Sequence, residues 1–459
     1  MKIKKKFTFK FTKIFTKSMV FSKVKDRLWK AFVHNRNRLL YITYQFNSPY
    51  LTTKLWILSS KKIVSSAKGI HSGSAIVFSS PGGDLDILEA FKGKPSKLDF
   101  YWLDGDLVHH LFKNFFGTTF EDYEYNSRIK NQESAMKKYE NYLSSIIDNL
   151  KEMCQLKVFV NFNFCASSQR KIMDLSPTKE IKFICIFKEC FRTPSLMRMT
   201  EIVYRSNIER INPYAIYVHN TEIKQMIVQS RIVSEERIIV TGQARSSYFF
   251  SEKLEAQGRV REEVFRITYF AIKPTAGLSY FGPAAEMNKI LEFENKNFNF
   301  RSISSRVEAS LIKLVKSNPK IKLTIKGKLQ TDYKIDARES SQIVVKLGPP
   351  NMELIETSDL IIGLNSTALV EGILAGKEVI SCEFGKNLNN FSVNYTYNFF
   401  DVVKVAHNEQ QLIQIIDLAL NKNRNSLNSR YKKVVIDKYL GNSDGAASNR
   451  LYDQINNLV

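Results

Sequence analysis

Short apolar segments alternate along the chain with longer amphipathic ones. Before residue 250, seven apolar segments have the length and composition of buried strands: residues 39–43, 75–79, 98–103, 157–161, 181–187, 214–219 and 238–241. Stretches with helical spacing, such as residues 134–150 and 220–230, lie between several of them. Buried strands that alternate with helices are typical of parallel βαβ units, so this part of the chain is predicted to be an α/β domain.

A second α/β set follows a polar, charged segment at residues 251–263. Its predicted strands are residues 267–272, 322–325, 342–346, 360–362 and 379–382, with a connecting helix at residues 306–316. The last thirty residues are predicted to be helical, with a break at residues 441–445.

The expected fold class is therefore α/β, with two Rossmann-like domains facing a central cleft and a basic N-terminal arm. The expected division is an arm at residues 1–37, a first domain at 38–250, a linker at 251–265, a second domain at 266–430 and a C-terminal helix at 431–459 that packs back toward the first domain. Open α/β sheets bind ligands at the carboxyl ends of their strands, so the cleft is the expected site.

Composition narrows the class of protein. The chain has 459 residues, 44% of them hydrophobic, and no run of 18 apolar residues, so no transmembrane helix is expected. The N-terminus lacks the apolar core of a secretory signal. Five cysteines without a Cys-x-x-Cys pair argue for a reducing compartment and against a disulfide framework or a zinc site. We expect a cytoplasmic protein.

The net charge of +23 is concentrated at the N-terminus. Residues 1–40 contain 13 Lys and Arg against one acid, Asp26, and their aromatic and aliphatic residues fall near helical spacing. A basic helix with an aromatic face suits the anionic inner surface of a cell membrane, and we predict peripheral attachment there. Nucleic-acid binding and a disordered tail are the alternatives.

The most informative segment is residues 358–385, which reads SDLIIGLNSTALVEGILAGKEVISCEFG. It predicts a strand, a small polar turn, a helix and a second strand. The amides and dipole of the helix start can hold a phosphate, and Asn365, Ser366 and Thr367 add side-chain donors. Glu371 lies too far along to complete a capping box. The alternative is an ordinary capped helix that binds nothing.

Several motifs in fixed order carry a family resemblance. They are VTGQARSSYF, with Gly242 and Arg245; YFAIKPTAG, with Lys273 and Thr275; LTIKGK, with Lys326; the segment at residues 358–385; and the C-terminal DGAASNRLYDQI. Together they resemble the two-domain glycosyltransferases of the GT-B type, in particular the group that contains CDP-glycerol glycerophosphotransferases and capsule or surface-polysaccharide transferases. Ala244 replaces the proline of that group, and its His-Pro pair is absent after Lys326.

The resemblance implies transfer of a sugar or polyol phosphate from a nucleotide-activated donor to a surface polysaccharide or lipid-linked acceptor, without a metal or cofactor. It assigns the acceptor to the first domain and the donor to the second. The expected donor-binding residues are Gly242, Arg245, Lys273, Thr275, Lys326, Asn365, Ser366, Thr367 and Glu371, with Glu371 on the ribose hydroxyls. Fixed cations there would stabilise charge on the departing phosphate. Lys273 and Lys326 can equally be strand-end lysines that reach solvent.

The acceptor hydroxyl needs a general base from the first domain. Glu189 in FKECFRTP is preferred to Asp84 in SSPGGDLDILEA, whose alternative role is a helix N-cap. The related transferases carry a His-Gly pair where this chain has Lys188 and Glu189, which leaves the base and the acceptor class open.

Two other function classes remain. A sugar-nucleotide 2-epimerase would share the architecture but would need no acceptor and no membrane. A non-enzymatic, basic nucleic-acid-binding protein would show affinity that falls steeply with salt. No specific nucleic acid is expected, because the charge is concentrated in one arm and no recognition module is evident elsewhere.

Overall fold

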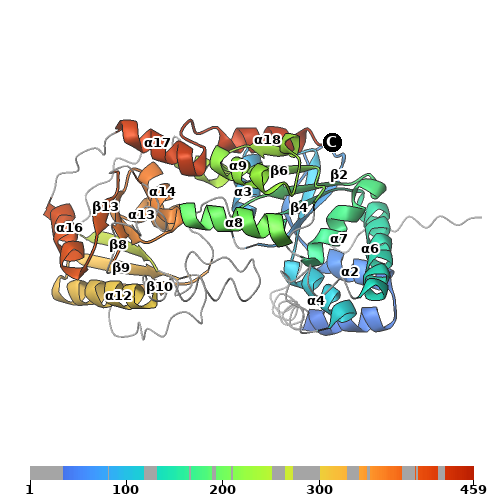
Figure 1. Ribbon diagram of the computed structural model, residues 1–459, viewed down its shortest axis with the longest axis horizontal. Helices are drawn as coiled ribbons and strands as arrows, with labels where there is room; N and C mark the ends of the chain where they lie inside the picture. The colour runs from blue at the N-terminus through green and yellow to red at the C-terminus, as the bar shows by residue number, and fades with distance from the viewer. Residues whose placement is uncertain are drawn as a thin grey trace, which may run out of the picture.

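The computed structural model consists of two lobes, each built on a mostly parallel sheet (Figure 1). It describes residues 35–80, 82–117, 132–164, 167–188, 193–207, 210–250, 264–271, 300–327, 341–348, 352–384, 399, 402–421 and 429–459. The basic arm up to residue 34 and the charged segment at residues 251–263 lie outside these ranges.

The N-terminal lobe contains a seven-stranded sheet of order β1-β3-β2-β4-β5-β6-β7. The strands are β1 Lys61–Val64, β2 Gly73–Phe78, β3 Leu98–Leu103, β4 Leu156–Asn161, β5 Lys182–Ile186, β6 Ala215–Val218 and β7 Ile238–Val240. All pair in parallel except β1, which runs antiparallel to β3 at the sheet edge. The helices are α2 Pro49–Ser59, α3 Gly83–Phe91, α4 Gly105–Phe116, α6 Glu133–Cys154, α7 Ser167–Leu175, α8 Pro194–Asn207 and α9 Thr221–Ser230, followed by the 3-10 segment η4 Ala244–Phe250.

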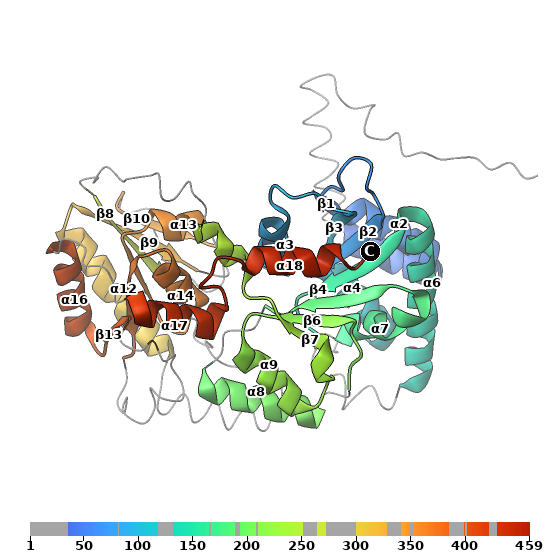
Figure 2. The same cartoon turned by 90° about the horizontal axis from the view of Figure 1, so that it is seen from above.

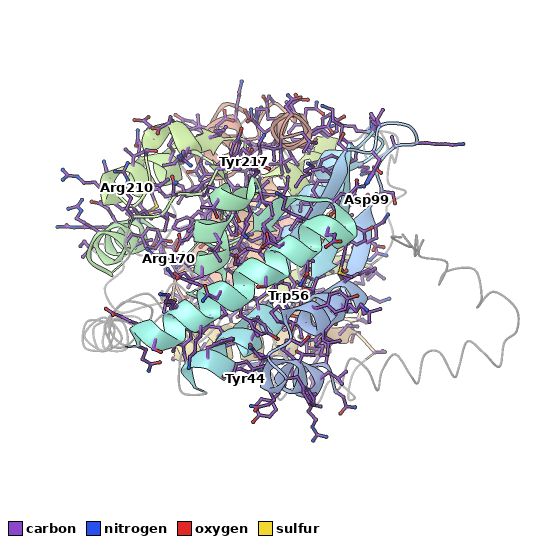
Figure 3. The ribbon with its side chains drawn as sticks, turned by 90° about the vertical axis from the view of Figure 1, so that its right-hand side faces the viewer. Tyr44, Trp56, Asp99, Arg170, Arg210 and Tyr217 are labelled. Atoms are coloured by element: carbon purple, nitrogen blue, oxygen red, sulfur yellow. The ribbon has the colours of Figure 1, made fainter. Side chains whose placement is uncertain are left out.

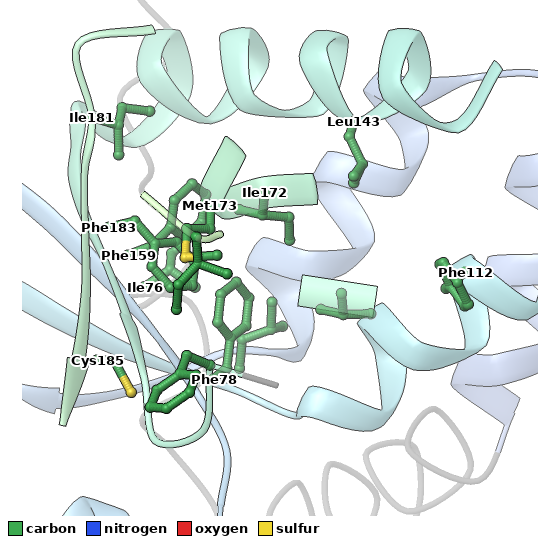
Figure 4. Packing of buried hydrophobic residues seen from close by; sticks show 14 of the residues in the cluster. Ile76, Phe78, Phe112, Leu143, Phe159, Ile172, Met173, Ile181, Phe183 and Cys185 are labelled. Atoms are coloured by element: carbon green, nitrogen blue, oxygen red, sulfur yellow. The ribbon is translucent and has the colours of Figure 1, made fainter. Parts of the chain in front are cut away.

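The two faces of this sheet form separate cores. On one face Ile76 and Phe78 of β2 pack with Phe159 of β4 and with the helices on that side, and the rings of Phe78 and Phe159 stack at 5.5 Å (Figure 4). On the other face Ala75 and Val77 pack beneath α3. Because successive side chains of a strand point to opposite faces, a central strand buried on both faces is largely apolar, as β2 is apart from the buried Ser74.

The C-terminal lobe contains a six-stranded, fully parallel sheet of order β10-β9-β8-β11-β12-β13. The strands are β8 Phe265–Phe270, β9 Ile321–Lys326, β10 Ile343–Lys346, β11 Leu360–Gly363, β12 Glu378–Cys382 and β13 Lys404–Ala406. The helices are α12 Phe300–Ser317, α13 Met352–Thr357, α14 Thr367–Leu374, α16 Glu409–Asn421 and α17 Ser429–Leu440. Since all six strands are parallel, their carboxyl ends meet at one edge of the sheet.

The C-terminal segment runs from one lobe to the other (Figure 2). Apolar residues of α17 pack against α14 in the C-terminal lobe. The last helix, α18 Ala447–Asn456, places Leu451 and Ile455 in the N-terminal core beside α3. The backbone between the two helices passes so close to β6 that a Cβ atom on Gly441 would lie 2.0 Å from the carbonyl oxygen of His219.

The predicted α/β class with two Rossmann-like domains is confirmed. The predicted strand at residues 39–43 is wrong, because residues 35–45 are helical. Its apolar run resembles a strand, but Leu40 and Thr43, three residues apart, share the buried face of a helix. The edge strands β1 and β13 were missed because their residues are largely half-buried or exposed and carry lysines. No helix among the described residues is long and apolar enough to cross a membrane.

Gly441 offers a test of the crossing between the lobes. Gly441→Ala is expected to lower the free energy of unfolding by roughly 2–3 kcal/mol more than Gly93→Ala, because both residues have positive φ but only Gly441 meets backbone. Gly93 has φ of +70° against +59° for Gly441, and no atom lies within 4 Å of its built Cβ, so it controls for backbone strain alone. Equal losses in chemical denaturation would contradict this packing.

Candidate functional site

A cavity of about 550 Å³ lies between the two lobes. It is bounded by α3 and η4 on one side and by the carboxyl ends of β9 and β10 with α13 on the other. Its lining residues are Leu85, Leu88, Glu89, Arg245, Tyr248, Lys326, Lys346, Leu347, Met352 and Glu353. A larger open hollow of about 710 Å³ lies along β7, but it contains none of the predicted site residues. The cavity between the lobes is therefore the candidate site.

Arg245 connects the two lobes at this cavity. Its backbone N–H donates to Asp86 Oδ1 at 2.9 Å, and its Nη1 donates to Asp86 Oδ2 at 3.2 Å. Its Nε donates to Glu371 Oε1 at 3.1 Å. Asp86 belongs to α3 of the N-terminal lobe and Glu371 to α14 of the C-terminal lobe, and both side chains are almost fully buried. One guanidinium therefore holds a carboxylate from each lobe.

Gln243 completes this cluster. Its backbone N–H donates to the carbonyl of Leu440 at 2.8 Å, which fixes it to the end of α17. With the amide oriented to suit its neighbours, its nitrogen donates to Glu371 Oε1 at 3.1 Å and its oxygen accepts from Arg245 Nη2 at 2.7 Å. We call Asp86, Gln243, Arg245 and Glu371 the junction cluster.

The junction cluster contains two carboxylates but one guanidinium. Burial raises the pKa of both Asp86 and Glu371, and Arg245 only partly offsets this. Burial alone would lower the pKa of Arg245, yet the two carboxylates raise it overall. The cluster therefore holds a proton to higher pH than an ordinary carboxyl group, and that proton belongs to the coupled pair. Nearby His219 is neutral, because burial and then the charge of Arg245 lower its pKa to about 3.

Lys326 lies at the end of β9, in the wall of the cavity. Its ammonium group donates to the carbonyl of Gly327 at 3.0 Å and to that of Gly348 at 2.6 Å. These bonds hold its charge at the carboxyl ends of β9 and β10, and Lys346 lines the same wall. The alternative of a lysine that reaches into solvent is wrong, since Lys326 is 8% exposed. Its role in donor binding stays a prediction.

The polar turn before α14 lies at the same edge of the sheet. Ser366 is the N-cap, and its hydroxyl accepts from the amide of Ala368 at 3.3 Å. Asn365 adopts φ of +48°, and Asn365, Ser366 and Thr367 are all half-buried. The turn follows β11 and is not part of the cavity lining at β9 and β10, because β8 lies between β9 and β11.

Two other predicted residues have clear structural positions. Gly242 has φ of +83°, and a Cβ there would lie 2.4 Å from the carbonyl oxygen of Gly441, so the glycine allows the C-terminal crossing. Asp84 lies in the first turn of α3, half-buried, and burial raises its pKa. The suggestion that Asp84 caps α3 is wrong, because Gly82 occupies the N-cap position.

Glu371 is 2% exposed and bonded to Arg245, rather than open to the polar turn. Glu189, Lys273 and Thr275 lie outside the described residues. Sequence reasoning gave no role at the site to Asp86, Gln243, Tyr248 and Lys346. Asp86 had a recognisable signal, since it is an acid on the apolar face of α3 beside Ile87 and Ala90. Among the described residues no group of three or more His, Cys, Asp or Glu side chains is arranged to hold a metal ion.

No protein-family model matches the sequence, and a search of curated proteins finds no match. Among solved structures, the chain is similar to the wall teichoic acid polymerase TagF, with 11% identity, 96% of this chain and 98% of that chain covered, and a TM-score of 0.49. It is also similar to UDP-GlcNAc 2-epimerase from Neisseria meningitidis, with 13% identity, 83% and 99% covered, and a TM-score of 0.43. A third similar structure is the glycotransferase of kitacinnamycin, with 12% identity, 84% and 99% covered, and a TM-score of 0.42.

The sequence suggested two enzyme classes, a transferase and a 2-epimerase. Because the identities are 13% or lower, the activity of this chain has to be argued from its own residues.

Removal of the Arg245 charge tests the junction cluster. Arg245→Met should lower the free energy of unfolding by about 3–5 kcal/mol, because two buried carboxylates lose their counter-ion. The matched control is Arg306→Met, which breaks an exposed pair with Glu409 and should cost less than about 1 kcal/mol. Similar losses for both variants in urea denaturation would show that the buried cluster does not stabilise the fold.

The proton held by the cluster predicts a pH dependence. The folded pKa of Glu371 is raised above its unfolded value, so its contribution to stability is present below about pH 4 and is lost as pH rises through the folded pKa. Glu371→Gln should therefore lose less stability than the parent chain as the pH rises above about 4. Glu409→Gln is the control, because Arg306 lowers the pKa of Glu409 and reverses the sign. Parallel curves of melting temperature against pH for Glu371→Gln and the parent would refute the raised pKa.

Proposed function

We propose that the protein is a glycosyltransferase that moves a sugar or a polyol phosphate from a nucleotide-activated donor to a surface or capsular polysaccharide or a lipid-linked acceptor. The observation that carries the proposal is the cavity at the carboxyl edge of the second sheet, where Arg245 and Lys326 from two separate sequence motifs line one space opposite α3. Two parallel α/β lobes with a site between them provide one lobe for each substrate.

Glu89 and Glu353 line the cavity beside three cations, and it is the cations that support a phosphate-bearing ligand. Lys326 and Lys346 place two ammonium groups at adjacent strand ends, and Arg245 lines the same cavity. The start of α14, with Ser366 and Thr367, adds amide and hydroxyl donors at the same edge. When a nucleotide leaves, negative charge grows on its phosphate oxygens, and cations already fixed in place stabilise it without reorganisation. The proposal therefore requires no metal ion or other cofactor.

Five further residues have proposed roles in binding the donor or in catalysis. A ribose-binding role for Glu371 requires its carboxylate to part from Arg245, because it is buried against that side chain here. Lys273 and Thr275, which follow β8 in the sequence, are proposed to contact the donor. For the general base we retain Glu189 and Asp84, and the raised pKa of Asp84 suits proton abstraction from a hydroxyl.

The basic arm supports a location at a membrane. We infer that residues 1–40 hold the enzyme on the anionic inner face of the cell membrane, in the cytoplasm, where a lipid-linked acceptor is available.

Nucleotide binding tests the site. In thermal-shift and calorimetric titrations with CMP, CDP, UDP and GDP and their sugars, one nucleotide should raise the melting temperature of the full chain. Lys326→Met is expected to weaken its binding by about tenfold or more, because a charge-assisted contact to phosphate is lost. Lys322→Met, which changes an exposed lysine on the same strand, should bind normally.

Ser366→Ala should weaken the same nucleotide several-fold, through loss of a donor at the start of α14. If Lys326→Met and Ser366→Ala both fold normally and bind with unchanged affinity, the donor site is misplaced. Product analysis separates the reactions: a transferase releases a nucleotide in the presence of acceptor, whereas a 2-epimerase returns an epimerised sugar nucleotide. Binding to DNA or RNA that falls steeply with salt, with no nucleotide binding, would favour the non-enzymatic alternative.

A further inference from the structure

Exposed apolar side chains are concentrated on two neighbouring helices of the N-terminal lobe, residues 35–45 and α2. Of the eighteen large hydrophobic residues that are exposed in the described part of the chain, seven lie between residues 39 and 58. They are Leu39, Tyr41, Ile42, Phe46, Tyr50, Leu51 and Leu58. We call this set the helical apolar surface. Single exposed apolar residues are ordinary, but such a concentration marks an interaction site.

The outward side of α2 is as apolar as its inward side. On the inward side, the hydroxyl of Thr52 is hydrogen-bonded to the hydroxyl of Thr43 at 2.7 Å and to that of Tyr142 at 2.7 Å. Trp56 is also buried on this side, whereas Leu51 and Leu58 face outward. A helix on a water-facing surface normally carries polar residues outward, and one that is apolar all round is normally covered on all sides.

The two helices that carry the helical apolar surface pack against the rest of the N-terminal lobe. Tyr44 packs edge-on against Phe115 of α4, with the ring centroids 4.8 Å apart, and Trp56 is 1% exposed. Figure 3 shows Tyr44 at the margin of the lobe and Trp56 further inside, toward α6. In Figure 1 the two helices lie at the end of the N-terminal lobe that is remote from the C-terminal lobe. The surface is thus preformed and well away from the cavity between the lobes.

The chain segment that carries the helical apolar surface is basic, and Arg36 in its first helix pairs with Asp104 at the start of α4. No Asp or Glu occurs between residues 27 and 83, and residues 1–83 contain 17 Lys and Arg against one acid. Arg38 and Lys54 are exposed among the apolar residues, and the Lys54 ammonium lies 4.4 Å from the centroid of the Tyr50 ring. Tyrosine and basic side chains over an apolar base suit the boundary between lipid headgroups and acyl chains.

We propose that the helical apolar surface docks onto an anionic lipid bilayer, as a folded contact separate from the basic arm. A second copy of the chain is a poorer occupant, because a two-fold contact would bring Arg38 and Lys54 of one copy against the same surface of the other. Anionic headgroups instead neutralise this charge, while Ile42, Leu51 and Leu58 enter the acyl boundary. This proposal goes beyond the transferase reaction and involves no residue of the cavity.

A flotation assay of the full chain with lipid vesicles tests the proposal. It compares phosphatidylcholine vesicles with and without about 30% phosphatidylglycerol, an anionic lipid. The parent chain should bind the anionic vesicles and retain part of this binding at high salt, where the charge contribution is screened. Ile42→Glu/Leu58→Glu should lower the partition coefficient at least about tenfold, because two apolar side chains no longer enter the bilayer. The matched control is Leu418→Glu on α16, since Leu418 is 53% exposed and Leu58 is 54% exposed.

Unchanged melting temperature and nucleotide affinity establish that the double variant is folded and that its cavity is intact. Equal partition of the double variant and Leu418→Glu would overturn the proposal. A second result would also overturn it: the parent chain is dimeric, the double variant is monomeric, and both float equally well. In that case a second copy of the chain covers the surface.

Discussion

The architecture depends on a single buried guanidinium placed where the two lobes meet. Arg245 follows the last strand of the first sheet, and through Asp86 and Glu371 it is bonded to a helix of each lobe. A charge in this position is stable only while its partners surround it, because an unpaired ion inside a protein carries a large desolvation penalty. The contact therefore specifies how the lobes meet and does more than add apolar area between them.

The C-terminal segment reinforces the same junction. Asn442 is fully buried, and its side-chain amide donates to the hydroxyls of Ser246 at 2.7 Å and Ser247 at 3.2 Å. Arg450 donates to the carbonyls of Thr241 at 2.9 Å and Gly441 at 2.7 Å. Hydrogen bonds from the last twenty residues of the chain therefore fix the segment that contains Arg245. Because Arg245 also lines the cavity, a ligand that binds there meets a group already coupled to both lobes.

The proposed membrane contact and the proposed donor site lie on different parts of the molecule. The helical apolar surface lies at the outer end of the N-terminal lobe, whereas Lys326 and Lys346, which line the cavity, lie on the C-terminal sheet. A lobe held at the bilayer can receive a lipid-linked or glycan acceptor, while the other lobe exchanges a water-soluble donor. The arrangement is consistent with the strongly basic first 83 residues, which contrast with the more balanced remainder of the chain.

Local sequence pattern was sufficient to predict the two α/β sets, the buried strands of both sheet centres, the capped start of α14 and the position of Arg245 and Lys326 at the carboxyl edges. These follow from short-range periodicity and turn chemistry, which are local properties. The partners of those residues were decided only by the tertiary structure. Asp86 and Arg245 are 159 residues apart, and nothing in the local pattern pairs them. Glu371 faces Arg245 rather than the polar turn, and residues 39–43 are helical, because side-chain direction and burial depend on how the elements pack.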